Sequence, residues 1–394
     1  MNKLSFLNLK KEKSRLNLLI GYFWLMPVIL SVFSGNIKLK FLGVNLFTAT
    51  IYGVFLIFLL INFKHVFLKI KGFDILFLVF IALSITITMI VFPQNTVYIK
   101  ANLFNWSFAF IYYLIGKLIA RTVSAQEVIG SVSKLGIIIS YIAYATTFGM
   151  TNKDMTFAYV VLTYVVMTAN SGFNKNKVTD LYWCIAGLIL IFILGTRGPL
   201  LFGVLYVLYR AFLKMGKGWK ITVLSVAGIS GALFVETNAY YAVLQNINAF
   251  LESRNIESYI IDQILSGNTS SDQMRSDVVE KVIDAIQKQP LGYGLFGDRV
   301  ILKGSYVHNI IVELLCAYGV VLGLILLVLL GLFIYRAIRH SKYYNRTNFL
   351  IAFIFIYLMK FFVSSSILND TFFGLFMGVF SFFYINERKR KNSM

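Results

Sequence analysis

Three polar residues have side chains suited to chemistry: Arg197, Arg275 and His308. A guanidinium stays charged and offers paired hydrogen-bond donors to an anion such as a diphosphate. It can also stabilise charge that develops on a leaving group. A neutral histidine can accept a proton as a general base. Together these residue types indicate chemistry on an anionic group with a proton transfer.

Arg197 follows Gly195-Thr196 at the junction of two apolar segments, 181–196 and 198–213. Each segment has about 16 residues, which as a helix spans roughly 24 Å and is short for a bilayer core of roughly 30 Å. We therefore expect the tip of this hairpin to lie below the membrane surface. A cation at that depth needs an anion or a water-filled cavity. The alternative is an arginine that reaches up to lipid headgroups.

His308 stands where a long polar segment enters the apolar run 308–334. Asn309 follows it, and Glu313 comes four residues after Asn309, so both are expected on one face of the same helix. A histidine at such an interface can serve as a general base. The alternative is an interfacial histidine without a catalytic role.

Arg275 lies early in a helix that the sequence predicts to begin at Ser270, with Gln273 completing a capping box. Pro290 is expected to end this helix. An anion-binding role is one interpretation of Arg275. The other is a surface ion pair with Asp272, which is the usual explanation for such an arginine.

The composition predicts that these residues are carried by membrane-spanning helices. Of the residues, 58% are hydrophobic and 14% charged, and the mean hydropathy is +0.75. Apolar runs long enough to cross a bilayer as helices follow one another, without the alternation of a membrane barrel. Twelve segments are predicted: 16–34, 41–62, 73–93, 102–120, 135–150, 155–171, 181–196, 198–213, 221–236, 308–334, 347–363 and 371–385.

The charges predict the orientation of this bundle. With the N-terminus inside, the whole excess of positive charge, +20, falls on the inner segments, as the positive-inside rule requires. Both termini are then cytoplasmic. The basic clusters are topology signals, so no nucleic-acid partner is expected. A signal peptide is the alternative for the N-terminus, but its apolar run ends near Ser34-Gly35 without a small-x-small cleavage pattern.

The fold class predicted is therefore an all-α integral membrane protein with about twelve transmembrane helices. Residues 1–394 form a single polytopic domain, and residues 237–307 form one large extracytoplasmic helical loop between the ninth and tenth helices. Loops of this length usually have a function. A further helical pattern is expected over 240–265.

Two familiar patterns do not fit this chain. Gly292, Gly294 and Gly297 match a dinucleotide-binding string, but the βαβ context that the motif needs is missing, and we interpret the glycines as a flexible turn. Three histidines and two cysteines, Cys184 and Cys316, offer no metal-ligand spacing. Both cysteines lie in apolar runs, so no disulfide framework is expected.

The ordered set of motifs resembles the O-antigen polymerase and O-antigen ligase family of bacterial envelope glycan assembly. The motifs are Gly195-Thr196-Arg197-Gly198, Arg275, Pro290-Leu291-Gly292-Tyr293-Gly294, Tyr306-Val307-His308-Asn309, Glu313 and Ala317-Tyr318-Gly319-Val320-Val321-Leu322-Gly323. They cover about 195–323, and the first half of the chain matches only as hydrophobic architecture. One departure is that Asp277 and Val278 stand where family members often have a tryptophan after the loop arginine.

The resemblance implies transfer of a glycan from a polyprenyl-diphosphate carrier to an acceptor hydroxyl, with inversion and without a nucleotide sugar, metal or other cofactor. It implies that Arg197 and Arg275 hold the diphosphate, with Arg275 at the catalytic centre. His308 would accept the proton of the attacking hydroxyl, and Asn309 and Glu313 would orient the hydroxyl or the sugar.

The function predicted is polymerisation of lipid-linked oligosaccharide repeat units into a capsule, O-antigen or exopolysaccharide. The alternatives are an O-antigen ligase, which transfers glycan to lipid A core, and a transporter or flippase of the same lipid-linked oligosaccharide. A transporter usually has ionisable residues along a central path, whereas Glu313, Lys360 and Arg210 lie near helix ends.

This function implies a location and partners. The location expected is the cytoplasmic (inner) membrane, with the active site on the extracytoplasmic face. The partners expected are the polyprenyl-diphosphate-linked donor and acceptor and membrane lipid. A chain-length regulator and a flippase are the protein partners that the resemblance implies.

The predicted orientation can be tested by cysteine labelling. In a chain with Cys184 and Cys316 replaced by serine, Ser253→Cys should react with an impermeant thiol reagent in intact cells, because residues 237–307 are predicted outside. Lys217→Cys should react only after the cells are opened. Labelling of the second position and not the first in intact cells would reverse the orientation.

Overall fold

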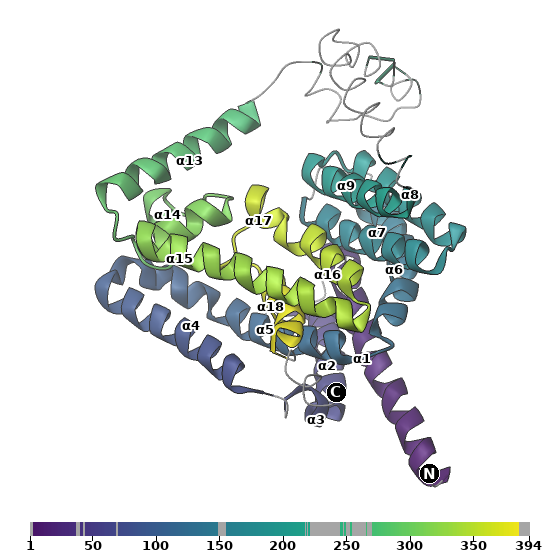
Figure 1. Cartoon of the computed structure of the whole chain (residues 1–394). Coiled ribbons are helices and arrows are strands. Elements are labelled where there is room, and N and C mark those ends of the chain that lie inside the picture. The colour runs from purple at the N-terminus through teal and green to yellow at the C-terminus, as the bar shows by residue number, and fades with distance from the viewer. Residues whose placement is uncertain are drawn as a thin grey trace. The chain divides into compact units, whose positions relative to one another are not determined.

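The computed structural model describes residues 3–36, 40–41, 44–67, 70–148, 155–216 and 270–385, with a few residues between 218 and 265. Helices and their connections make up these residues (Figure 1), apart from an antiparallel pair of two-residue strands, β1 (Lys40–Phe41) and β2 (Val44–Asn45). The all-α class predicted from the sequence is confirmed.

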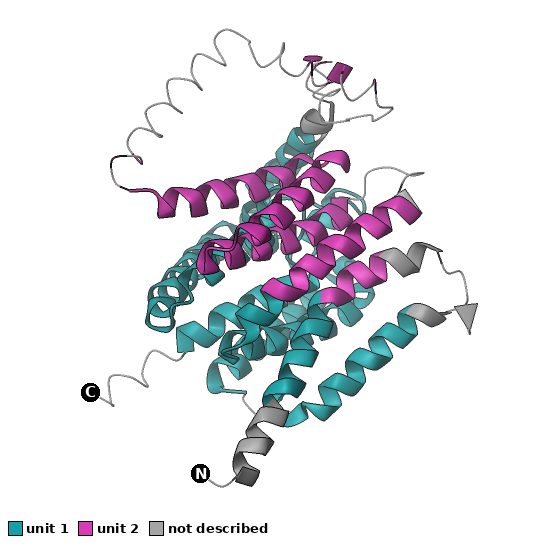
Figure 2. Cartoon of the chain, turned by 90° about the vertical axis from the view of Figure 1, so that its right-hand side faces the viewer, with its two compact units in different colours: residues 1–24, 46–129, 272–394 teal, residues 25–45, 130–271 magenta. Residues whose placement is uncertain are grey.

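The chain divides into two compact units (Figure 2). Unit 1 comprises residues 1–24, 46–129 and 272–394, and unit 2 comprises residues 25–45 and 130–271. Both units fall within the single polytopic domain predicted over 1–394, which stays a prediction.

The described helices of the two units have the following bounds. Unit 1 contains α2 (Leu46–Ile61), α3 (Phe63–Val66), α4 (Gly72–Val91), α5 (Thr96–Arg121), α13 (Ser270–Lys288), α14 (Gly297–Ile301), α15 (Ile310–Ser341), α16 (Thr347–Phe353), α17 (Lys360–Val363) and α18 (Thr371–Ile385). Unit 2 contains α7 (Met155–Lys175), α8 (Val178–Ile193) and α9 (Arg197–Lys214). Both α1 (Lys3–Asn36) and α6 (Ala125–Ala143) contribute residues to the two units, and the first two residues of α13 belong to unit 2.

Several of these helices are long and apolar enough to cross a membrane. Within the described parts of the chain, six meet both conditions: Lys13–Ser31, Gly72–Val91, Pro93–Arg121, Ala125–Thr146, Met155–Lys175 and Ile310–Tyr344. The protein is therefore a multi-pass membrane protein. The predicted span 221–236 and most of the helical pattern 240–265 lie outside the described residues. The described part of each other predicted span is mainly helical, although the span 41–62 begins with the two short strands, and the total of about twelve crossings stays a prediction.

Helices α5 and α18 of unit 1 pack at close range because α18 presents glycines to its neighbour. A Cβ atom on Gly374 would lie 2.0 Å from the carbonyl oxygen of Ala109, and one on Gly378 would lie 1.9 Å from that of Tyr113. Small residues at a helix interface allow the backbones this approach and strengthen packing within a membrane.

Helix α13 has the bounds that the sequence predicts. It begins at Ser270, as expected, and ends at Lys288, two residues before Pro290. Its apolar side is buried through Val282 and Ile286, which belong to one hydrophobic cluster with Val312 and Cys316 of α15. Packing against α15 therefore fixes the helix that carries Arg275.

The long helix α15 is interrupted at Gly319, whose φ of 78° and ψ of 170° are not helical. The glycine-rich connection after α13 binds on both sides of this break. The backbone N–H of Tyr293 donates to the carbonyl of Cys316 (2.8 Å), and that of Val320 donates to the carbonyl of Pro290 (2.9 Å). Backbone groups that the break releases thus have partners, and the turn that we expected to be flexible is hydrogen-bonded to α15.

The break can be tested with two glycines of the same helix. Alanine at position 319 would adopt a backbone conformation that is essentially restricted to glycine, at a cost of about 1 to 3 kcal/mol. Its Cβ would also lie 2.6 Å from the carbonyl oxygen of Pro290. We expect Gly319→Ala to lower the midpoint of thermal unfolding in detergent clearly. Gly331→Ala is the matched control, since a Cβ there meets nothing within 4 Å. Equal midpoints for the two variants would contradict the packing described.

Candidate functional site

Arg197 lies in unit 2, at the hairpin between α8 and α9. Helix α8 has 16 residues, which matches the short span expected, and Gly195 (φ 70°) turns the chain after it. Arg197 is the first residue of α9, and its side chain is exposed. The other predicted site residues lie in unit 1, so the two sets are described separately.

His308 of unit 1 is held by a backbone carbonyl. Its Nδ1 lies 3.2 Å from the carbonyl oxygen of Ser364. A carbonyl can only accept a hydrogen bond, so Nδ1 carries the hydrogen and Nε2 keeps its lone pair when the ring is neutral. The phenol ring of Tyr306 lies 4.0 Å away between ring centroids, and its hydroxyl donates to the same carbonyl at 3.4 Å.

The surroundings of His308 favour the neutral imidazole. The residue is half-buried, and burial lowers its pKa below the usual range. The cations of Arg275 and Arg299 lower this pKa further, whereas the hydrogen bond to Ser364 and the carboxylate of Asp298 raise it. At neutral pH the ring is therefore unprotonated and able to accept a proton at Nε2. One of these two cations, Arg275, is exposed on α13.

Asn309 caps the N-terminus of α15. Its Oδ1 accepts hydrogen bonds from the backbone N–H groups of Ile311 (2.9 Å) and Val312 (3.3 Å), as an N-cap residue does. The preceding residue, His308, has a left-handed backbone (φ 54°), a conformation in which histidine is more frequent than most residues. The N-cap and this backbone conformation together determine the direction in which the His308 side chain points. A substrate contact by Asn309 would have to use Nδ2.

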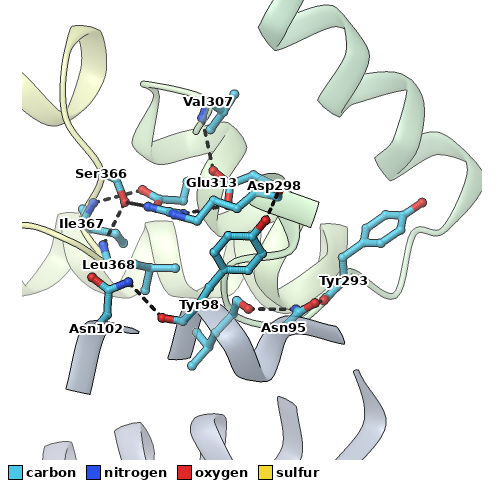
Figure 3. A network of polar contacts seen from close by, with 12 residues as sticks. Asn95, Tyr98, Asn102, Tyr293, Asp298, Val307, Glu313, Ser366, Ile367 and Leu368 are labelled. Carbon is cyan, nitrogen blue, oxygen red and sulfur yellow. Dashed lines mark hydrogen bonds and ion pairs between the residues drawn. The ribbon is translucent and has the colours of Figure 1, made fainter. Parts of the chain in front are cut away.

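Glu313 is buried in an ion network with residues that the sequence did not single out (Figure 3). Arg299 lies at its centre. Nη1 of Arg299 is 2.9 Å from Oδ1 of Asp298 and 3.6 Å from Oε1 of Glu313, and Nη2 donates to Oγ of Ser366 at 2.7 Å. The charged side chains are only 2 or 3% exposed. A buried guanidinium and two buried carboxylates stabilise one another, because removing any one of them would leave a buried charge without a partner.

The same network joins three separate segments of unit 1. The Ser366 hydroxyl donates to Oε1 of Glu313, and the backbone N–H of Ile367 donates to Oε2 at 3.0 Å. Asp298 extends the network to the backbone N–H of Val307, which donates to Oδ2 at 3.2 Å. The carboxylate of Glu313 is thus occupied by protein donors, and its predicted role as a substrate-binding residue stays a prediction.

Asn95, directly before α5, also binds the glycine-rich connection (Figure 3). Nδ2 of Asn95 donates to the carbonyls of Tyr293 (2.7 Å) and Leu295 (2.8 Å). The Tyr98 hydroxyl donates to the carbonyl of Arg299 at 3.4 Å. These hydrogen bonds fix the backbone from residue 293 to Arg299.

Three residues of this site were missed in the sequence: Asp298, Arg299 and Ser366. A signal was present for each. Asp298 and Arg299 are adjacent opposite charges in an apolar stretch between two of the family motifs, and Ser366 ends a run of three serines between apolar segments. What the sequence did not show was that these segments meet.

A metal or cofactor was not expected, and this stays a prediction. Within the described ranges no group of three histidine, cysteine, aspartate or glutamate side chains could hold a metal ion. Cys184 and Cys316 are both free and buried. The candidate site described in unit 1 comprises Arg275, His308 and the buried ion network, and Arg197 lies in unit 2.

Comparison with known families gives one match. Residues 182–328 match a family model described as O-antigen ligase. The match includes every motif from Arg197 to Gly323 that carries the resemblance, and the resemblance is confirmed. The match supports the O-antigen polymerase and ligase family for this region, a family of membrane glycosyltransferase-like enzymes. No curated protein and no solved structure matches the chain.

The buried network predicts a large difference between two arginine substitutions. Arg299→Gln leaves Asp298 and Glu313 buried without their cation, and breaking a buried pair in this way costs about 3 to 5 kcal/mol. Arg336→Gln is the matched control, because Arg336 is exposed on α15. We expect thermal unfolding in detergent to occur at a much lower temperature for Arg299→Gln alone. Similar unfolding temperatures would mean that Asp298 and Glu313 do not depend on Arg299.

Proposed function

We propose that the protein polymerises polyprenyl-diphosphate-linked oligosaccharide repeat units into a surface polysaccharide. The acceptor hydroxyl attacks the anomeric carbon of the donor, and a new glycosidic C–O bond forms. The bond from that carbon to the diphosphate oxygen breaks, and polyprenyl diphosphate leaves with the electron pair. The proton of the hydroxyl passes to Nε2 of His308. Direct displacement inverts the anomeric configuration, and no nucleotide sugar takes part.

One observation carries this proposal: Nδ1 of the His308 imidazole is hydrogen-bonded to the Ser364 carbonyl, which leaves Nε2 as the proton acceptor. Burial and two neighbouring cations lower its pKa, while the Ser364 carbonyl keeps the hydrogen on Nδ1. A base that is free at neutral pH and held in one orientation is what proton abstraction from a sugar hydroxyl needs. It lies in the region that matches the family.

The arginines are proposed to bind the diphosphate. Arg275 acts at the catalytic centre, since its charge already acts on His308, and Arg197 is assigned to the diphosphate on the family motif that contains it. Guanidinium groups bind phosphate oxygens through paired donors and stabilise charge on the leaving group. Asn309 and Glu313 are assigned to orienting the acceptor hydroxyl or the sugar.

The membrane arrangement proposed with this function has about twelve helices and cytoplasmic termini. Residues 237–307 form the extracytoplasmic loop, and the reaction takes place on that face of the cytoplasmic membrane. A donor already activated by its diphosphate suits this side, where nucleotide sugars are not supplied. A flippase would deliver the donor, and a chain-length regulator would act on the product.

A ligase is the second candidate, because the matching family model is described as O-antigen ligase. We favour the polymerase, because the predicted extracytoplasmic loop 237–307 is of modest length and the first half of the chain shows no ligase-like signature. A transporter is less well supported, because charged residues of unit 1, Arg275, Asp298 and Arg299, act on one acid–base group, His308.

The glycan of a deletion strain separates the two enzymes. For a polymerase, we expect single repeat units on their carrier or acceptor and no long chains. For a ligase, full-length chains would accumulate on the carrier lipid. Reintroducing the gene should restore the missing product. Normal polysaccharide in the deletion strain would contradict both proposals.

Substitutions test the division of labour at the site. His308→Ala should lower the rate of chain formation by about 10²- to 10⁴-fold, the usual contribution of a general base, with donor binding retained. Arg197→Lys keeps the charge but loses the planar pair of donors, so it should keep part of the donor binding, and Arg197→Ala almost none. Purified variants with checked folding would be compared for donor binding and rate. Loss of donor binding in His308→Ala with intact binding in Arg197→Ala would mean that the roles are reversed.

A further inference from the structure

We propose that the connection between α17 and α18, residues 364–370, is the element that orients the catalytic histidine, and that Ser366 is its positioning residue. We call this connection the serine segment. The inference rests on the proposed function, because it assumes that His308 is the general base. It assigns to residues outside the matched family region a part in the reaction.

The first residue of the serine segment contacts the base directly. The carbonyl of Ser364 accepts hydrogen bonds from Nδ1 of His308 (3.2 Å) and from the hydroxyl of Tyr306 (3.4 Å). Its own N–H is bonded to the carbonyl of Lys360 at 2.8 Å, which ties it to the last turn of α17. The position of one carbonyl oxygen thus decides the orientation of the imidazole.

The middle of the segment is fixed to the buried ion network. Ser366, 2% exposed, stands two residues after the carbonyl that holds His308. Its hydroxyl donates to Glu313 and accepts from Nη2 of Arg299 (2.7 Å) and from the N–H of Leu368 (3.2 Å). One donor and two acceptor sites are thereby all used. Two residues span at most about 7 Å, so a shift of Ser366 is transmitted to the Ser364 carbonyl.

The far end of the segment is anchored by a second ion pair. Lys360 pairs with Asp370, and both are largely buried, with 9 and 14% of their side chains exposed. Oδ2 of Asp370 accepts from the Ser365 hydroxyl at 3.0 Å, while Oδ1 accepts from the N–H of Phe372 at 2.9 Å. The segment is therefore held at its beginning, middle and end, which is more than a simple connection between helices requires.

A backbone carbonyl suits the chemistry of this base. It keeps the hydrogen on Nδ1 and leaves Nε2 as the acceptor, the task that a buried carboxylate performs in hydrolytic triads. A carbonyl has no net charge, so it orients the ring without strongly favouring the imidazolium. Beside two cations, the ring then returns its proton easily after each transfer.

The orientation can be measured in the unaltered protein. We expect ¹⁵N NMR of protein labelled at the histidine rings to show His308 as the tautomer with hydrogen on Nδ1 at neutral pH. His308→Gln assigns the signal against those of His65 and His340. A neutral His308 with its hydrogen on Nε2, or a fast mixture of both tautomers, would overturn the inference.

Activity measurements test Ser366 itself. Misplacing a catalytic group by about 1 Å can cost on the order of 100-fold in rate, so we expect Ser366→Ala to lower kcat by about 10- to 100-fold with little change in KM. Because the Ser364 hydrogen bond raises the pKa of His308, loosening it should move the acid limb of the pH–rate profile to lower pH. Ser366→Thr, which keeps the hydroxyl, should restore part of kcat. Ser140→Ala is the control, since Ser140 is a buried serine bonded to its own helix.

The outcomes distinguish this inference from the function on which it rests. A fully active His308→Ala would remove the general base and with it the proposed mechanism. An inactive His308→Ala, together with wild-type kcat and pH profile in Ser366→Ala, would overturn only the positioning role. If Ser366→Ala lowers the amount of folded protein but leaves kcat and the acid limb unchanged, Ser366 is structural and the inference fails.

Discussion

The candidate site depends on the requirement that a buried guanidinium keep its partners. Arg299 has Asp298 beside it in sequence, Glu313 on the helix that follows and Ser366 much further along the chain. Removing any of these would leave a charge or donor unpaired at depth, which costs far more than an exposed contact. The cluster therefore holds α14, the start of α15 and the serine segment together.

The break in α15 has a related effect. Gly319 stops the regular hydrogen bonds of a membrane helix, and the connection after α13 supplies backbone partners for the groups released. Non-helical backbone at membrane depth is tolerated where protein satisfies it. This contact fixes the end of α13, while the apolar residues Val282 and Ile286 fix its face. Arg275 stands on α13 and His308 directly before α15, and the packing of α13 against α15 supports both residues.

The site combines a neutral base with permanent cations, an arrangement suited to transfer from a diphosphate donor. The cations favour the anionic leaving group and also lower the pKa of the base. In the proposed reaction, one set of charges would bind the diphosphate, stabilise the leaving group and keep the proton acceptor neutral. In a proposed mechanism without metal, arginines take the part that a divalent ion has in other diphosphate chemistry.

The sequence by itself determined the features that depend on neighbours along the chain. Apolar runs determined where helices lie, Ser270 and Pro290 bounded α13, and the motifs from Arg197 to Gly323 identified the family. These are local signals, because helix formation and membrane partition depend on consecutive residues. Only the tertiary structure decided that Ser366 bonds Glu313, 53 positions away, and that Asn95 bonds Leu295 across 200 positions. Such distant pairs leave no periodic pattern in the sequence. A buried polar group can bond any partner of suitable geometry, so only the fold decides which residue becomes its partner.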